Sequence, residues 1–263
     1  MTGSAAQRGL GLIELMIALV LGLVLVLGVV QIFLASKQSY ALQQHQSAIQ
    51  ENARYLLSRI STELRQAGLF GCLDLERLPA SVRSQVPDEF ATPITYADGQ
   101  LRILTALSPV SRTAGTGPLS TDSSVSAAEF GARWVLVSDC LNELRVGTGS
   151  SALSLAPGDT VIPVRQLEYE LRDNAIRVRT NGVGSPQVLI DGVAEFSVEF
   201  GLAAAPLDAN VSDSYVTSVA GQESRIRSVR LALGLSDNPG DAEQAQVRTQ
   251  RFAVVTTLRG RQP

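Results

Sequence analysis

Glu14 is the residue of this chain whose type and position most need a chemical explanation. It is the single charged member of the apolar segment Leu10–Ile17. A carboxylate placed near the middle of a lipid bilayer costs about 2.5–3.5 kcal/mol on insertion scales, and less near the bilayer edge. We therefore expect Glu14 to have a functional role and to require a cationic partner.

Other residues that could do chemistry are few. The 263 residues include one histidine, His45, and two cysteines, Cys72 and Cys140. A Ser-His-Asp or Cys-His catalytic site would have to use His45, which falls on a predicted helix away from the predicted strands. A zinc site would have to draw most of its ligands from carboxylates, which is unusual. The sequence thus predicts no catalytic residues, no metal site and no cofactor, and it favours a protein that is not an enzyme.

Two segments resemble ligand-binding loops without their full pattern. Gly147–Ser151 is rich in glycine but lacks the lysine of a phosphate loop, so we interpret it as a turn. Asp237, Asn238, Asp241 and Glu243 could offer oxygen atoms to calcium, but their spacing matches no ordered ligand pattern. A solvated hairpin loop is the preferred interpretation.

Composition argues against one class of partner. The chain has 22 basic and 25 acidic residues and a formal net charge of -3, whereas nucleic-acid binding normally needs a basic face. We expect no nucleic-acid partner.

Apolar residues make up 45% of the chain, enough for the packed core of one good-sized domain with an appendage, or at most two domains.

The two cysteines are ambiguous by themselves. They lie 68 residues apart, and they would be buried thiols in the cytosol or a disulfide bridge in an oxidising compartment. The compartment has to be inferred from the N-terminal segment.

That segment contains a long uncharged run. Leu15–Ser36 has 22 residues without a charge, and about 20 apolar residues suffice for a helix to span the hydrocarbon core. A cleaved secretory signal would have a shorter run of about 7–15 residues followed by a small-x-small site, and no such site precedes Lys37. The sequence predicts a transmembrane helix over about residues 15–36.

The residues before this run resemble the processing signal of type IV prepilins. The resemblance rests on the sequence Arg8–Glu14 (RGLGLIE) directly ahead of the uncharged run. It implies that residues 1–9 are a leader, that prepilin peptidase cleaves between Gly9 and Leu10, and that the new amine of Leu10 is N-methylated. It also implies that Glu14 pairs with the N-terminal amine of a neighbouring subunit during filament assembly. Most pilins have phenylalanine where this chain has Leu10.

A helical pattern continues beyond the membrane run. No proline occurs before Pro79, and Gly68 is well placed to end the helix. Apolar residues recur at intervals of three and four, which defines one face of an α-helix: Ile49, Ala53, Leu56, Leu57, Ile60, Leu64 and Ala67. We predict one long helix over residues 10–68, whose first half is apolar all round and whose second half packs against a sheet.

Residues 69–263 are predicted to form a head domain in which strands dominate. Asp173 and Asn174 are turn residues between two alternating segments and predict a hairpin. Alternation gives each strand one wet and one buried face, so we expect an antiparallel sheet packed on the helix. The fold class is α+β, and a long helix joined to such a head is what the pilin resemblance implies. The predicted strand segments are Leu101–Leu107, Arg133–Asp139, Leu167–Leu171, Ile176–Val178, Phe196–Phe200, Val229–Leu235 and Arg251–Arg259.

Landmarks in the head resemble the PilW family of minor pilins. They are Leu69–Cys72 directly after the helix, Val137–Cys140, and the paired segments Ile226–Leu235 and Gln250–Arg259. The resemblance is strong over the first 72 residues and patchy beyond them. It implies that Cys72 and Cys140 are bonded, in keeping with a periplasmic head in an oxidising compartment.

The PilW resemblance implies a minor pilin that takes part in initiating or assembling a type IV pilus. Its partners would be prepilin peptidase, other minor pilins, the major pilin and the lipid of the inner membrane. The chain would cross the inner membrane once, with a periplasmic head, and be incorporated into the pilus. Two alternatives remain open: a minor pseudopilin of a type II secretion system, and a membrane-tethered periplasmic adhesin or binding module.

Overall fold

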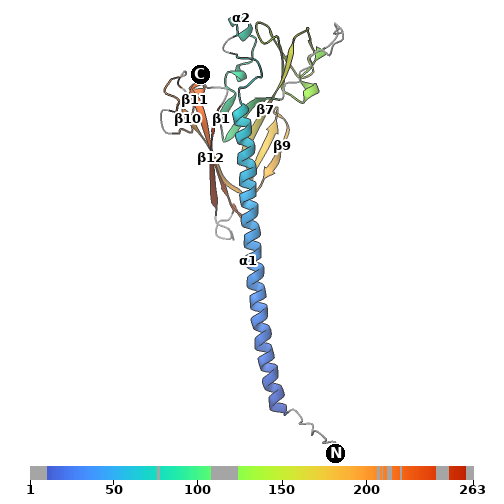
Figure 1. Cartoon of the computed structure of the whole chain (residues 1–263), viewed down its shortest axis with the longest axis vertical. Helices are drawn as coiled ribbons and strands as arrows, with labels where there is room; N and C mark the ends of the chain where they lie inside the picture. Colours follow the sequence, from blue (N-terminus) through green and yellow to red (C-terminus); the bar gives the residue numbers. More distant parts are fainter. Residues whose placement is uncertain are drawn as a thin grey trace, which may run out of the picture. The chain divides into compact units, whose positions relative to one another are not determined.

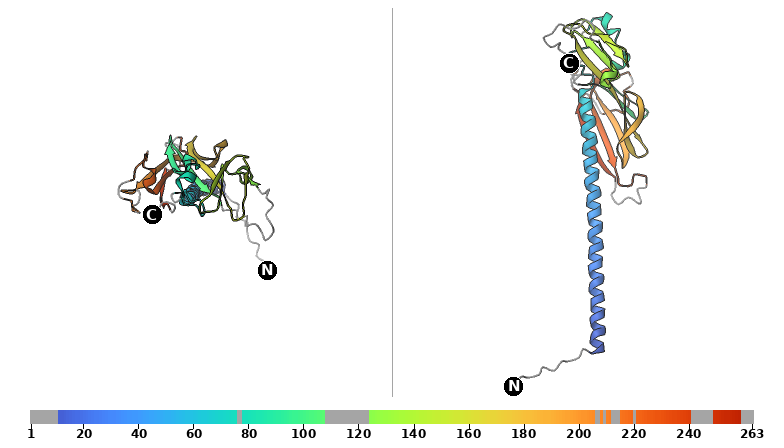
Figure 2. Two further views of the ribbon diagram at one scale, coloured as in Figure 1. Left: turned by 90° about the horizontal axis from the view of Figure 1, so that it is seen from above. Right: turned by 90° about the vertical axis from the view of Figure 1, so that its right-hand side faces the viewer.

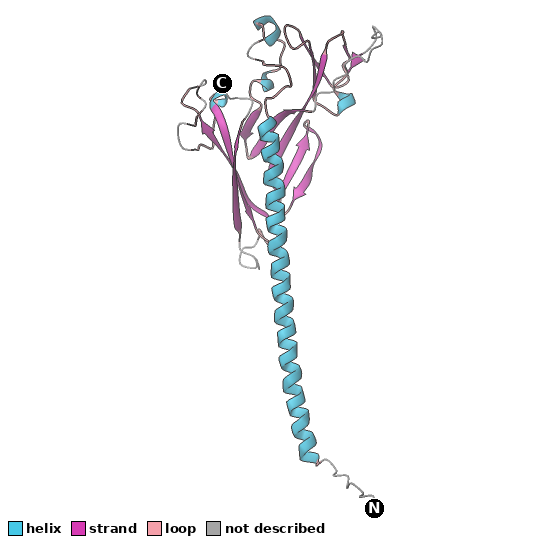
Figure 3. Cartoon of the chain, viewed as in Figure 1, coloured by secondary structure: helices cyan, strands magenta, loops and turns pink. Residues whose placement is uncertain are grey.

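The structure, a computed structural model, describes residues 11–75, 78–107, 124–205, 208, 210–211, 215–219, 221–240 and 249–258. Its contacts divide the chain into two compact units, residues 1–48 and 49–263. One helix, α1 (Leu12–Gln66), contributes to both. Within the described residues, the first unit contains the N-terminal part of α1, and the second contains the rest of α1 together with the strands (Figure 1, Figure 3).

The amphipathic half of α1 forms as its sequence predicts. Gly68 has a φ of +74°, the left-handed conformation that ends many helices and that glycine adopts without strain. Directly before it, Ala67 pairs with Thr105 in an isolated bridge, so the chain passes from the helix to the edge of a strand. The predicted face is buried at every position: Ile49, Ala53, Leu56, Leu57, Ile60, Leu64 and Ala67.

The largest described sheet has seven strands, ordered β1-β2-β7-β4-β5, with β8 and β9 continuing from β7. All of its pairings are antiparallel. The long strand β7 has β2 on one edge, whereas β4 and then β8 follow each other along the opposite edge. The strands are β1 (Ile94–Ala97), β2 (Gln100–Ala106), β4 (Trp134–Ser138), β5 (Leu144–Thr148), β7 (Thr160–Arg172), β8 (Ala175–Thr180) and β9 (Val183–Ile190).

A second antiparallel sheet contains β10 (Val193–Leu202), β11 (Ile226–Leu235) and β12 (Gln250–Thr257) in that order. The short strands β3 (Ser124–Val125) and β6 (Leu153–Ser154) pair separately. Four short helices complete the described elements: α2 (Ala80–Arg83), η1 (Asp88–Phe90), η2 (Ala128–Phe130) and η3 (Glu223–Arg225).

The main core lies where α1 meets both sheets. In the head, the two sheets lie side by side against the C-terminal part of α1, with β10–β12 to one side and β7–β9 to the other (Figure 1, Figure 2). One continuous cluster of buried side chains joins Leu56 and Ile60 of the helix to Tyr169 of β7 and Phe200 of β10. The expected antiparallel packing on the helix is therefore confirmed, although it is divided between two sheets.

A second core underlies the disulfide. Phe70, Phe90 and Trp134 contact each other in series, the first pair tilted and the second edge-to-face, with ring centroids 4.9 Å and 5.2 Å apart. Cys72, two residues after Phe70, and Cys140 are bonded, with their Cα atoms 5.6 Å apart. The disulfide implied by the PilW resemblance is thus confirmed in the structure.

Loss of this disulfide is expected to destabilise the head by about 4 kcal/mol, because the bond closes a 68-residue loop and restricts the unfolded chain. Denaturant unfolding of the full chain in detergent, followed by tryptophan fluorescence of Trp134, measures the effect. The Cys72→Ser/Cys140→Ser variant should unfold at the same denaturant concentration as reduced wild type and well below oxidised wild type. Equal midpoints for the oxidised wild type and the variant would contradict the prediction.

Candidate functional site

Glu14 lies in the first turn of α1. The carbonyl of Gly11 accepts hydrogen bonds from the backbone N–H groups of Glu14 at 3.1 Å and Leu15 at 3.2 Å, which starts the helix directly before the carboxylate. An acidic side chain in a first turn is favoured by the partial positive charge of the helix N-terminus. Glu14 is exposed and makes no ion pair within the described part of the chain. The geometry leaves its carboxylate free for a partner from outside this subunit.

The helix around Glu14 exposes an apolar surface on every side. The most apolar 18-residue window has a mean hydropathy of 3.0, and none of it is buried. Leu12 is 80% exposed and Ile32 is 72% exposed, and the large apolar residues between them are exposed as well. Soluble monomers rarely leave more than a few hundred Å² of continuous apolar surface in water. This segment is long and apolar enough to cross a membrane, and it has to be covered by lipid or by other apolar helices.

The predicted processing residues lie outside the described part of the structure. Gly9 and Leu10 belong to residues 1–10, so cleavage between them and methylation of Leu10 remain predictions. The leader boundary at residue 9 remains a prediction for the same reason. The structure does not test the calcium alternative either, because Asp241 and Glu243 also lie outside the described residues.

The described residues show no other site of the kinds considered from the sequence. His45 is exposed on α1, the helix on which the sequence places it. No group of three or more histidine, cysteine, aspartate or glutamate side chains within the described ranges is arranged to hold a metal ion.

A comparison with protein families bears on the N-terminal segment. Residues 4–30 match the family model described as the prokaryotic N-terminal methylation motif. The match includes Gly9, Leu10, Glu14 and the greater part of the uncharged run, up to residue 30. A search of curated proteins found no match to the chain. The chain therefore carries a type IV pilin-like signal, which implies processing by a prepilin peptidase and pilin-type partners, and its fold is the α+β architecture of a long apolar helix with an antiparallel β-sheet head.

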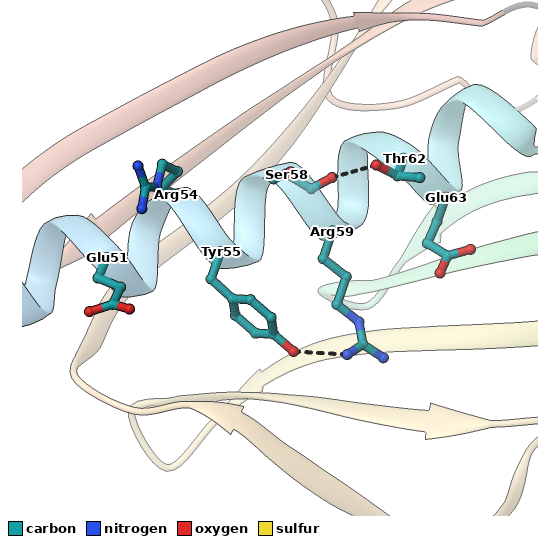
Figure 4. Close-up of a pocket in the computed structure, with 7 residues that line it drawn as sticks. All are labelled: Glu51, Arg54, Tyr55, Ser58, Arg59, Thr62 and Glu63. Atoms are coloured by element: carbon teal, nitrogen blue, oxygen red, sulfur yellow. Dashed lines mark hydrogen bonds between the residues drawn. The ribbon is translucent and has the colours of Figure 1, made fainter.

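Sequence reasoning missed a polar hollow on the flank of α1 (Figure 4). The hollow measures about 580 Å³ and is lined by helix residues alone: Glu51, Arg54, Tyr55, Ser58, Arg59, Thr62 and Glu63. Glu63 forms an ion pair with Arg165 of β7, with Oε1 2.8 Å from Nη2. Its other carboxylate oxygen, Oε2, is buried without a hydrogen-bond partner.

Tyr169 of β7 is fully buried and lies near Arg59 and Glu63 of the hollow. Burial raises the pKa of its phenol above the usual range, so the hydroxyl stays protonated. The guanidinium of Arg59 is close enough to influence that pKa, yet the Tyr169 hydroxyl makes no hydrogen bond of normal geometry with the described residues. The sequence signal that could have indicated the hollow is the polar side chain at every fourth position, 51, 55, 59 and 63. The approach of Arg165 and Tyr169 from β7 can be seen only in the folded structure.

Proposed function

We propose that this protein is a minor pilin of the PilW type, which takes part in initiating or assembling a type IV pilus at the inner membrane. In this proposal prepilin peptidase removes residues 1–9, and the chain remains in the membrane with a periplasmic head until it joins the filament. Other minor pilins and the major pilin are its partners. The protein acts as a structural subunit and not as an enzyme.

The observation that carries this proposal is the position of Glu14. A match to the methylation motif, an exposed apolar helix and a carboxylate in the first turn of that helix occur together at one end of the chain. A lone carboxylate is unfavourable in lipid, and a neighbouring subunit's N-terminal amine would neutralise it. An ordinary membrane anchor has no need of such a residue.

Two other functions remain as alternatives. A minor pseudopilin of a type II secretion system would use the same N-terminal chemistry. It would differ from a pilin only in the assembly that the subunit joins, a secretion pseudopilus in place of a pilus. A membrane-tethered periplasmic adhesin or binding module would use its loops to hold a ligand; the polar hollow on α1 is a described surface that could take part.

The N-terminus of the mature protein tests the proposal. We expect mass spectrometry of the protein purified from its own cells to find a chain that begins at N-methylated Leu10. We also expect the protein in sheared pilus fractions, and not in those from cells without the peptidase. A mature chain that begins elsewhere would contradict pilin-type processing, whereas correct processing together with presence in a secretion pseudopilus alone would favour the pseudopilin.

A further inference from the structure

Arg59 carries a positive charge that nothing in the described part of the chain balances. Its guanidinium is half-buried at the flank of α1, and no carboxylate among the described residues makes an ion pair with it. Its Nε atom is enclosed and has no hydrogen-bond acceptor. Because a partly buried charge is unfavourable unless it is paired, Arg59 requires an explanation.

The interior side of the hollow offers no counter-charge. Glu63, on the next turn, pairs through Oε1 with Arg165 at 2.8 Å, and its Oε2 makes no hydrogen bond with Arg59. Tyr169, buried close to both, is a neutral phenol. The charges on the sheet side therefore sum to zero without Arg59, so a compensating anion has to come from the open side.

Tyr55 prepares that open side for an acceptor. Nη1 of Arg59 donates a hydrogen bond to the Tyr55 hydroxyl at 2.9 Å, and the two side chains extend from the same flank of the helix (Figure 4). Since the hydroxyl oxygen accepts from Arg59, its own proton is free to be donated outward. Tyr55 is 47% exposed, so this donor is reachable. A guanidinium fork and an adjacent O–H group are the donors that a carboxylate binds with charge-assisted hydrogen bonds.

We propose that Arg59 and Tyr55 form a docking site for an aspartate or glutamate side chain of a neighbouring subunit. This inference rests on the proposed function, because filament assembly is what brings a second subunit to the helix. A single carboxylate fits the charge of the site, whereas an anionic lipid surface would also meet Glu51 and Glu63 in the same hollow.

Photo-crosslinking of the full chain in its own cells tests the docking site. A photoreactive benzoylphenylalanine replaces Thr62, which lines the hollow one turn from Arg59. We expect mass spectrometry to identify a crosslinked peptide that contains an acidic residue and comes from another protein with a prepilin-type signal. Arg59→Gln should lower the crosslink yield at least about tenfold, since it removes one partner of a partly buried charge pair, and Tyr55→Phe should lower it less.

Arg65→Gln is the matched control, because Arg65 is exposed on the same helix outside the hollow and its loss should leave the yield unchanged. An unchanged denaturant midpoint of the oxidised protein, followed by Trp134 fluorescence, verifies that each variant is folded. Arg59→Glu combined with a change of the partner's acidic residue to arginine should restore the crosslink.

An unchanged yield in Arg59→Gln, a crosslink to phospholipid, or no crosslink at all would each overturn the docking site. If these results accompany a mature N-terminus at Leu10 and presence in pili, the docking site alone is wrong. A mature N-terminus elsewhere would instead overturn the proposed function.

Discussion

A Gly9→Val variant is expected to accumulate in the membrane as the uncleaved precursor. Glycine leaves the backbone before the scissile bond free of a side chain, which lets the chain enter a narrow peptidase site. A β-branched residue adds bulk at that bond, and displacement of a reacting bond by about 1 Å can slow an enzymatic step about a hundredfold. The intact mass of the purified protein should therefore retain the nine-residue leader.

Gly22→Val provides the control for this prediction, since it makes the same replacement inside the apolar helix. A Cβ atom at Gly22 would meet no described atom within 4 Å, so the substitution should leave both the helix and its processing intact. Cleavage of Gly9→Val at the normal rate would show that the peptidase does not read this glycine, and the pilin-type interpretation of residues 1–9 would fail with it.

The part of the molecule that the sequence predicts best is α1, because a helix is specified by local spacing. Buried residues at three- and four-residue intervals identify the packed face without knowledge of what covers it. Gly68 marks the end of the helix for an equally local reason, since its φ of +74° favours glycine. The predicted helix of residues 10–68 and the observed Leu12–Gln66 differ at their ends by two residues, with residue 10 outside the described part.

The alternating pattern predicts the hairpin strands β7 and β8 and fails at the strand that follows them. The hairpin at Asp173 and Asn174 is confirmed, with both residues at positive φ as a tight two-residue turn requires. Strand β9 (Val183–Ile190) was not predicted, because Gly184 and Pro186 interrupt its pattern. Proline is tolerated there because β9 pairs with β8 alone among the described strands.

The division of the head into two sheets could not be read from the sequence. Strand β7 has 13 residues, and along one edge its partner changes from β4 to β8. This change of partner depends on contacts between segments far apart in the sequence, which a local pattern does not encode. The expectation of one wet and one buried face also fails at Glu168, which is 3% exposed. Arg102 and Arg179 lie opposite it on the two neighbouring strands, and they contact its carboxylate at 3.3 Å and 2.6 Å.

Glu168 shows why a buried charge can occupy a strand of this head. Burial by itself raises the pKa of the Glu168 carboxyl, but the hydrogen bond and positive charge of Arg179, together with Gln166 and Arg102, lower it below its usual value. The group is therefore ionised and satisfied by its neighbours. Alternation of residue types along β7 contains no information about these partners, because they come from β2 and β8.

The two candidate sites also differ in whether local sequence or distant contacts define them. The N-terminal signal is a short local motif, so Glu14 could be identified from the sequence together with the uncharged run behind it. In the sequence, the polar residues around Arg59 cannot be distinguished from those of any exposed helix face. Its significance depends on Arg165 and Tyr169, which approach from a strand about a hundred residues further along the chain.

Glu14→Ala is expected to separate processing from assembly. Cleavage after Gly9 depends on the residues at the scissile bond, so the mature protein should form and remain in the membrane. The isolated subunit is not destabilised by the change, because a carboxylate in lipid is unfavourable: it costs about 2.5–3.5 kcal/mol at the bilayer centre and less near the edge, where the first turn of the helix lies. In a filament, by contrast, the amine of a neighbouring Leu10 would lose its counter-charge in an apolar environment, and breaking such a pair costs about 3–5 kcal/mol. We therefore expect the amount of this protein in sheared pili to fall at least tenfold, at an unchanged level in the membrane.

Two further variants identify charge as the cause. Glu14→Gln keeps the size of the side chain and should fail as Glu14→Ala does, whereas Glu14→Asp keeps the charge and should retain part of the incorporation. Glu143→Gln makes the same change of charge at an exposed position of the head and should have no effect. If Glu14→Gln enters pili as wild type does, the carboxylate is not neutralised by a neighbouring amine. The exposed apolar helix would then associate through packing alone, and the acidic residue in its first turn would serve helix initiation and nothing further.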